Sequence, residues 1–169
     1  ACIIYLLGWQ YTGHDSGYPS VDKVNESLGG YKELVNLITE AKKLNVNVSF
    51  YDNYDDSYPT HPGWDPDVIC RDPQGNLMLG GAWDGEQSYL ISSYKYAMKS
   101  GLNRISYTLK TYPVEKAYFI DVLAGGYHGG RKYDFNPASP AGAQKNFEGK
   151  LKIIEAFNKR GLDVATEDF

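Results

Sequence analysis

The segment Ala117-Tyr118-Phe119-Ile120-Asp121 is an apolar run of strand length that ends on a carboxylate. Three other apolar runs, at residues 3–7, 46–50 and 162–166, are likewise followed by polar side chains. Runs of about four to eight residues rich in Ile, Val, Tyr and Phe are typical of parallel strands buried on both faces. The polar ends of such strands meet at one edge of the sheet, where parallel α/β proteins bind ligands.

The segments between these runs carry the periodicity of amphipathic helices. We expect helices at residues 30–44, 92–109 and 140–159, each with one apolar stripe against the sheet. Gly101 weakens the middle of the second segment, so we expect a kink or two shorter helices there. The third stripe is expected to turn Phe147, Leu151 and Phe157 inward. The predicted order is therefore βαβαβαβ.

This order predicts an α/β fold, a partial (β/α)8 TIM barrel with about four consecutive parallel strands and intervening helices. A closed barrel of this type needs about eight strands, whereas the chain begins inside one apolar run and stops just after Glu167. We therefore expect residues 1–169 to be a fragment, roughly half of a barrel, with the remaining half as its partner. A self-contained open α/β sheet is the structural alternative.

The longest connection, at about residues 52–92, is rich in Asp, Gly, Pro, Trp and Tyr. Long connections of this kind usually carry function. Trp9, Trp64 and Trp83 lie in or beside the connections that follow the strands. Such a surface suits a ligand that is polar yet has flat apolar faces.

Charge and composition narrow the classes of partner. The net charge of -4 and the sequence pI near 5.3 give no electrostatic reason to expect a nucleic acid or an anionic membrane. No apolar run approaches the roughly 18 residues of a membrane span. Cys2 and Cys70 are too far apart for a metal motif, so we expect two buried thiols, with a disulfide as the alternative.

Asp121 and Glu167 are carboxylates at the ends of two consecutive predicted strands. Each alone could anchor a loop. Adjacent strands lie about 4.8 Å apart, so the two side chains can converge on one pocket. Facing carboxyl groups can divide their roles, one ionised and one protonated, as glycoside hydrolysis requires.

Several motifs in this chain occur in an order that resembles a known family. They are Gly8-Trp9-Gln10, Gly13-His14-Asp15-Ser16-Gly17-Tyr18-Pro19, Asp52-Asn53-Tyr54-Asp55-Asp56, Trp64-Asp65-Pro66-Asp67-Val68-Ile69, Tyr118-Phe119-Ile120-Asp121-Val122 and Asp163-Val164-Ala165-Thr166-Glu167. This set is similar to the catalytic barrel of endo-α-N-acetylgalactosaminidases and their uncharacterised bacterial glycosidase-like relatives. The resemblance is greater to those relatives, which share the segments at residues 52–56 and 64–69. The chain departs from the family at residues 123–126 and 168–169, where the family has a Trp-Gly pair; this bears on the substrate more than on the reaction.

The resemblance implies roles for four residues. Asp121 falls on the nucleophile and Glu167 on the acid/base, whereas His14 and Asp15 fall on a pair that contacts the sugar. The implied substrates are α-linked, galacto-configured glycans. The resemblance also favours an extracellular or cell-surface location.

Other polar and aromatic residues are further candidates for sugar binding. Gln10, Asp52 and Asn53 could hydrogen-bond sugar hydroxyls, although Asp52 and Asn53 could instead order the long loop. Trp83 could stack on a sugar face or pack in the loop. His128, in a Gly-rich loop, is expected to be solvated, with a sugar contact as the alternative.

No cofactor and no metal are expected. The segment at residues 52–56 lacks the ligand spacing, central Gly and terminal Glu of a helix-loop-helix calcium site. The leading hypothesis is a retaining glycoside hydrolase acting on α-linked GalNAc or Gal glycans, with the fragment inactive by itself. The alternatives are a non-catalytic carbohydrate-binding barrel and a metal-dependent sugar isomerase or epimerase.

Overall fold

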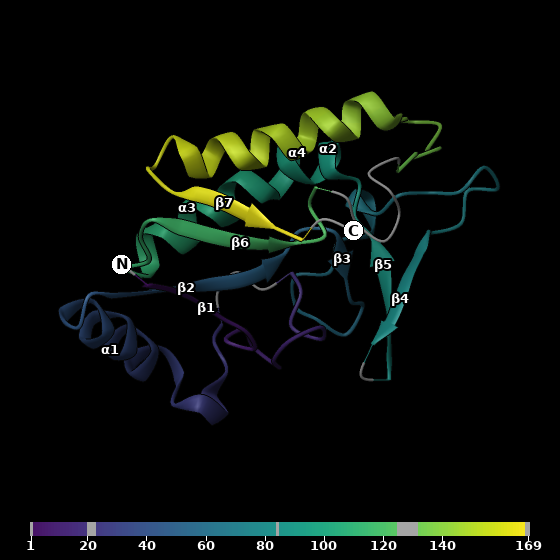
Figure 1. Cartoon of the computed structure of the whole chain (residues 1–169). Helices are drawn as coiled ribbons and strands as arrows, with labels where there is room; N and C mark the ends of the chain where they lie inside the picture. The colour runs from purple at the N-terminus through teal and green to yellow at the C-terminus, as the bar shows by residue number, and fades with distance from the viewer. Residues whose placement is uncertain (1, 20–22, 84, 125–131, 168–169) are drawn as a thin grey trace.

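The computed structural model describes residues 2–19, 23–83, 85–124 and 132–167. Within them, a parallel sheet has the strand order β1-β2-β6-β7 (Figure 1). Its members are β1 (Cys2–Leu6), β2 (Val46–Asn53), β6 (Ala117–Asp121) and β7 (Asp163–Thr166). Neighbours in the sheet are thus consecutive in the βα order, which confirms the predicted parallel strands of a partial TIM barrel.

Helices join these strands where the periodicity predicts them. α1 (Gly30–Lys43) connects β1 to β2, and α4 (Ala143–Asn158) connects β6 to β7. The middle connection holds α2 (Ser93–Tyr96), a π-helical turn η3 (Ala97–Gly101) and α3 (Leu102–Thr111). The predicted interruption at Gly101 is confirmed. Figure 1 shows α3 and α4 over the same face of the sheet. Among the described residues, no helix is long and apolar enough to cross a lipid bilayer.

The inward face of α4 differs from the predicted stripe. Phe147 and Leu151 are 53% and 41% exposed, whereas Phe157 is buried as expected. The reason lies at Gly149, where a Cβ atom would come within 2.4 Å of the Ser93 backbone. Close contact with α2 through this glycine turns the apolar pair outward. The cysteine expectation is also corrected in part, because Cys70 is buried but Cys2 is exposed, and both thiols are free.

The long connection after β2 forms a second, smaller sheet. It contains β3 (Asp56–Ser57), the 3-10 turn η2 (Pro66–Val68), β4 (Leu79–Trp83) and β5 (Glu86–Leu90). The antiparallel order is β3-β5-β4. Figure 1 shows this sheet beside the carboxyl ends of the parallel strands. A further 3-10 turn, η1 (Glu26–Leu28), precedes α1.

Strand alternation divides the side chains of the parallel sheet between two faces. Tyr118 and Ile120 of β6 are fully buried and belong to the core cluster under the helices. Phe119 and Asp121 therefore lie on the opposite face. Tyr51 of β2 is in register with Phe119, and the two rings stack with centroids 4.7 Å apart. This second face carries the candidate site.

Candidate active site

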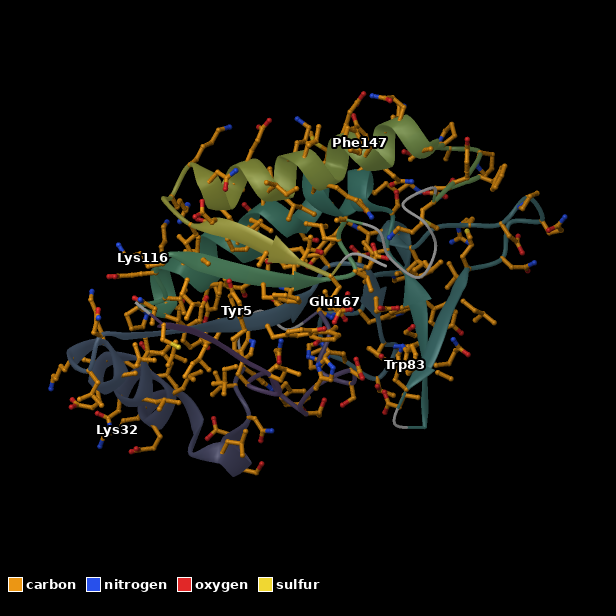
Figure 2. The ribbon with its side chains drawn as sticks, viewed as in Figure 1. Tyr5, Lys32, Trp83, Lys116, Phe147 and Glu167 are labelled. Atoms are coloured by element: carbon orange, nitrogen blue, oxygen red, sulfur yellow. The ribbon has the colours of Figure 1, made fainter. Side chains whose placement is uncertain are left out.

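Asp121 and Glu167 come together because β6 and β7 are parallel and in register. Ile120 pairs with Thr166, so the residue that follows each member of this pair is one of the two carboxylates. Both line a cavity of about 370 Å³ at the carboxyl end of the sheet. Figure 2 shows Glu167 between the end of this sheet and the β4–β5 hairpin. Of the residues expected in the site, those at the cavity are His14, Asp15, Trp83, Asp121 and Glu167.

The two carboxyl groups interact directly. Burial raises the pKa of Asp121 to about 7, and a hydrogen bond from the protonated Asp121 to Glu167 and the negative charge of Glu167 act in the same direction. The Tyr51 hydroxyl opposes this shift by donating to Asp121. Tyr51 also donates to Glu167 Oε1 over 3.1 Å. Asp121 therefore keeps its proton until the pH approaches neutrality.

Asn53 links the nucleophile candidate to the long loop. Its Nδ2 donates to Asp121 Oδ2 at 3.4 Å and to Asp56 Oδ2 at 3.0 Å. Its Oδ1 accepts the backbone N–H groups of Asp55 and Asp56 at 2.7 and 2.8 Å. Asn53 therefore orders the loop, which is one of its two expected roles, and it also orients Asp121. It is not among the residues that line the cavity.

Asp52 and Gln10 do not reach the cavity, so the expectation that they bind sugar is corrected. Alternation places Asp52 on the helix side of β2, where it is fully buried and paired with Arg104 of α3. It also accepts the Tyr118 hydroxyl at 2.8 Å. Gln10 is fully buried, and its Nε2 donates to the Tyr51 carbonyl at 2.9 Å. Both residues therefore stabilise the strands that carry the site and do not contact the cavity.

His14 and Asp15 lie at the cavity in the turn after β1. His14 Nε2 is 3.4 Å from Asp15 Oδ1, and His14 Nδ1 shares a hydrogen bond of 2.9 Å with the Tyr18 hydroxyl. The His14 ring also stands edge-on to Tyr51, with centroids 5.3 Å apart. Asp15 has φ +61°, a left-handed conformation that Asp tolerates better than most residues. Both side chains are partly exposed and thus accessible to a ligand.

Trp83 sits at the end of β4, where it is 44% exposed and forms part of the cavity wall. In Figure 2 it lies on the hairpin side of the site, across from Glu167. Its indole lies over Gly81, since a Cβ atom there would come within 2.4 Å of the ring. The missing side chain at Gly81 thus makes room for the indole.

A strained turn follows Asp121. Val122 has φ +48°, which is rare for a β-branched residue and typical of backbone held in place by its surroundings. Thr166 Oγ1 accepts the N–H groups of Leu123 and Ala124 at 3.1 and 3.2 Å. Lys150 of α4 donates to the Leu123 carbonyl at 2.8 Å. These contacts tie the turn after Asp121 to the strand that carries Glu167. His128, further along this connection, lies outside the described residues.

Sequence reasoning missed three functional candidates. Tyr51 directly follows the apolar run at residues 46–50 and was not singled out, although strand alternation places it on the same face as Asn53. Asp56 lines the cavity, and burial raises its pKa. Lys132 forms a buried ion pair with Asp55, across 77 residues of sequence, for which the sequence carried no signal.

Comparison with known proteins places this geometry in a family. The sequence profile described as endo-α-N-acetylgalactosaminidase matches residues 2–167. The chain belongs to the endo-α-N-acetylgalactosaminidase family. The match covers the strands, the helices and every residue of the cavity.

Solved structures agree with this family in fold. The ligand-free α-N-acetylgalactosaminidase NagBb from Bifidobacterium bifidum superposes with a TM-score of 0.83 at 19% identity, over 98% of this chain and 27% of that one. Its complex with Gal-NHAc-DNJ gives 0.85 at 19% identity, over 98% and 26%. The α-galactosidase TtGalA from Thermus thermophilus, with p-nitrophenyl α-D-galactopyranoside, gives 0.59 at 14% identity, over 93% and 29%. The chain thus spans about a quarter of the length of these glycosidases, and its fold is part of their TIM barrel.

Proposed function

We propose that this protein is a retaining glycoside hydrolase, with Asp121 as the nucleophile and Glu167 as the acid/base. The proposal is carried by the position of the two carboxyl groups, which follow paired residues of adjacent parallel strands and line one cavity. Retaining enzymes hold their carboxyl groups about 5 to 5.5 Å apart, whereas inverting enzymes leave about 6.5 to 9.5 Å for a water molecule. Because the Tyr51 hydroxyl reaches both carboxyl groups, the two lie close together, which supports the retaining class.

The substrate chemistry favours an enzymic nucleophile. In an α-linked 2-acetamido sugar, the acetamido group lies on the same side as the leaving group and cannot attack from the opposite face. Asp121 would instead bond to the anomeric carbon while Glu167 protonates the departing oxygen. Glu167 would then take a proton from water as that water displaces Asp121. Two inversions give net retention.

The shared proton has to move before the first step. In the free chain the raised pKa belongs to Asp121, although a nucleophile must be ionised. Tyr51 and Asn53 both donate to Asp121 and so favour its carboxylate. When a glycosidic oxygen enters the cavity, it offers an acceptor to a proton on Glu167. The proton therefore passes from Asp121 to Glu167 along the hydrogen bond that joins them.

The proposed substrate is an α-linked, galacto-configured sugar, GalNAc or Gal. His14 and Asp15 present an imidazole and a carboxylate side by side, which suits two neighbouring hydroxyl groups. Trp83 offers an exposed aromatic face at the cavity wall for a sugar ring. The solved relatives support this class, because NagBb was solved in complex with GalNAc and TtGalA in complex with p-nitrophenyl α-D-galactopyranoside.

Activity is proposed to require the remaining strands of the barrel as a partner. The parallel sheet supplies four strands, and its edge strand β1 exposes Ile3 and Ile4 by 39% and 48%. Exposed apolar side chains on an open sheet edge suit coverage by further protein. The 169-residue chain by itself is therefore expected to be inactive.

The stereochemistry of the first product tests the mechanism. The protein with all strands of its barrel, called the intact protein below, is given an aryl α-N-acetylgalactosaminide. The freed sugar is followed by proton NMR before it mutarotates. The proposal expects the α anomer to form first. Initial formation of the β anomer would show inversion and overturn the assignment of Asp121 as nucleophile.

A further inference from the structure

We propose that Tyr51 is a third catalytic group, whose hydroxyl turns between Asp121 and Glu167 and donates to whichever of them is ionised. The inference rests on the proposed function and deepens it, because it concerns how the same site moves its charge. The observation behind it is the position of one hydroxyl group within hydrogen-bonding reach of both carboxyl groups.

The Tyr51 ring is held firmly, so its hydroxyl has a fixed place. Phe119 stacks on one side at 4.7 Å, with only 15° between the ring planes. His14 meets the ring edge-on at 5.3 Å. The backbone carbonyl of Tyr51 accepts hydrogen bonds from both Trp9 and Gln10, which fixes the main chain. Rotation of the O–H bond is then the motion left to the group.

Tyr51 is suited to donate rather than to ionise. Burial raises its pKa above the ordinary value of 10.0, and the negative charges of Asp121 and Glu167 raise it further. The phenol therefore keeps its proton wherever the pair functions. A neutral hydroxyl carries a single proton, so it can serve one carboxylate at a time while its oxygen accepts from a protonated neighbour.

During the proposed reaction, the negative charge is first on Asp121 and then on Glu167. Before the first step Asp121 is ionised and Glu167 is protonated, so the Tyr51 O–H points to Asp121. Bond formation converts Asp121 into a neutral ester, and the proton leaves Glu167 with the sugar oxygen. Turning the O–H toward Glu167 then stabilises the new carboxylate. Tyr51 neither gains nor loses a proton in either step.

Other charged and titratable groups also face Asp121, Glu167 and Tyr51. Asp56 of β3 raises the pKa of Asp121, as does Glu167. Groups that also line the cavity or act on Tyr18 beside it are His14, Asp15, Asp52 and Asp55, the last paired with Lys132. A change confined to the Tyr51 oxygen leaves all of these in place.

The test compares Tyr51→Phe with a matched control, Tyr5→Phe. Tyr5 also packs on Phe119, with centroids 5.2 Å apart, but on β1 and near Asp163, which begins β7. In the intact protein, Tyr51→Phe is expected to lower kcat by about 10²-fold, the usual effect of losing one donor to a developing charge. The hydrogen bond from Tyr51 lowers the pKa of Asp121, so its loss raises that pKa, and the acidic limb of the kcat/KM profile should move to higher pH. Tyr5→Phe should change neither quantity.

If Tyr51 had only a structural role, Tyr51→Phe would reduce activity without moving the acidic limb. The pH of the acidic limb therefore distinguishes a catalytic from a structural role. Carboxyl carbon NMR of Asp121 gives the same answer without turnover, and its titration should shift upward in Tyr51→Phe. If that variant does not fold, 3-fluorotyrosine at position 51 keeps the shape and strengthens the donor, which should move the limb downward. An unmoved titration, with Asp121→Ala inactive, would overturn the role of Tyr51 and leave the proposed function intact. Full activity of Asp121→Ala would overturn both.

Discussion

Arg104 of α3 and Asp52 of β2 form an ion pair in which both side chains are fully buried. The Arg104 guanidinium also donates to the Asn53 carbonyl at 3.0 Å and lies over the Tyr54 ring at 4.2 Å. Because Asn53 contacts Asp121, the pair connects a helix of the outer layer to the proposed nucleophile. It holds the end of β2 in the conformation that the site requires.

Removing one member of this pair should destabilise the protein more than removing both. Asp52→Leu leaves a buried guanidinium without its partner, which costs about 3 to 5 kcal/mol. The double variant Asp52→Leu with Arg104→Met should recover a large part of that loss. Urea unfolding of the three proteins gives the comparison. Equal losses in the single and double variants would mean that the ion pair is not what stabilises this end of β2.

Thr166 should affect turnover through its hydroxyl. Thr166→Val keeps the shape but removes the acceptor for the N–H groups of Leu123 and Ala124, so the strained turn at Val122 is released. We expect kcat to fall by about tenfold with a small change in KM, because Asp121 loses its orientation. Thr166→Ser keeps the hydroxyl and serves as the control. A normal kcat for Thr166→Val would show that the turn holds without this contact.

The raised pKa of Asp121 predicts how stability depends on pH. The folded protein binds this proton with a pKa of about 7, against an ordinary value of 3.8. The stabilising contribution is therefore full below about pH 4 and is lost as the pH rises through about 7. Asp121→Asn cannot ionise, so it should gain stability relative to the wild type between pH 5 and pH 8.

Urea unfolding at several pH values measures this difference. Asp163→Asn, at the exposed opposite end of β7, is the control and should show no such trend. A constant difference between Asp121→Asn and the wild type from about pH 4 to about pH 8 would contradict the raised pKa.

The strands and helices followed from the sequence because they repeat a local pattern. Residues 117–121 combine β-branched or aromatic side chains with a terminal carboxylate, and the structure makes them β6. The α4 stripe was wrong at Phe147 and Leu151 because the contact through Gly149 depends on another helix. Periodicity within one segment carries no information about such a partner.

The site was predictable where residues follow strand ends and less so elsewhere. Asp121 and Glu167 could be placed together because parallel register brings strand ends to one edge. Asp52 was misplaced because two adjacent residues of a strand face opposite sides, and the facing of β2 was not fixed from its composition. Arg104 pairs with Asp52 of β2 and Lys132 with Asp55 of the loop after it, each far away in sequence, which only the tertiary fold reveals.

Asp15 should control the preference between sugar epimers. A site that hydrogen-bonds a particular hydroxyl rejects the epimer, whose binding leaves buried polar groups unpaired. We expect hydrolysis of α-galacto substrates to exceed that of α-gluco epimers by at least about tenfold, equivalent to about 1.4 kcal/mol. Asp15→Ala should remove most of this preference. If kcat/KM ratios for the epimers are the same in both proteins, the His14–Asp15 pair serves only to shape its turn.

Azide rescue of Asp121→Ala tests the central assignment most directly. In the intact protein this variant should be almost inactive on an aryl α-N-acetylgalactosaminide, because no group remains to attack the anomeric carbon. Azide can enter the vacated space, and the expected product is the β-glycosyl azide, of inverted configuration. Glu167→Ala should instead keep activity on substrates with good leaving groups, which need no proton. An Asp121→Ala protein with wild-type activity, or β-azide formed by Glu167→Ala and not by Asp121→Ala, would contradict the roles assigned to the pair.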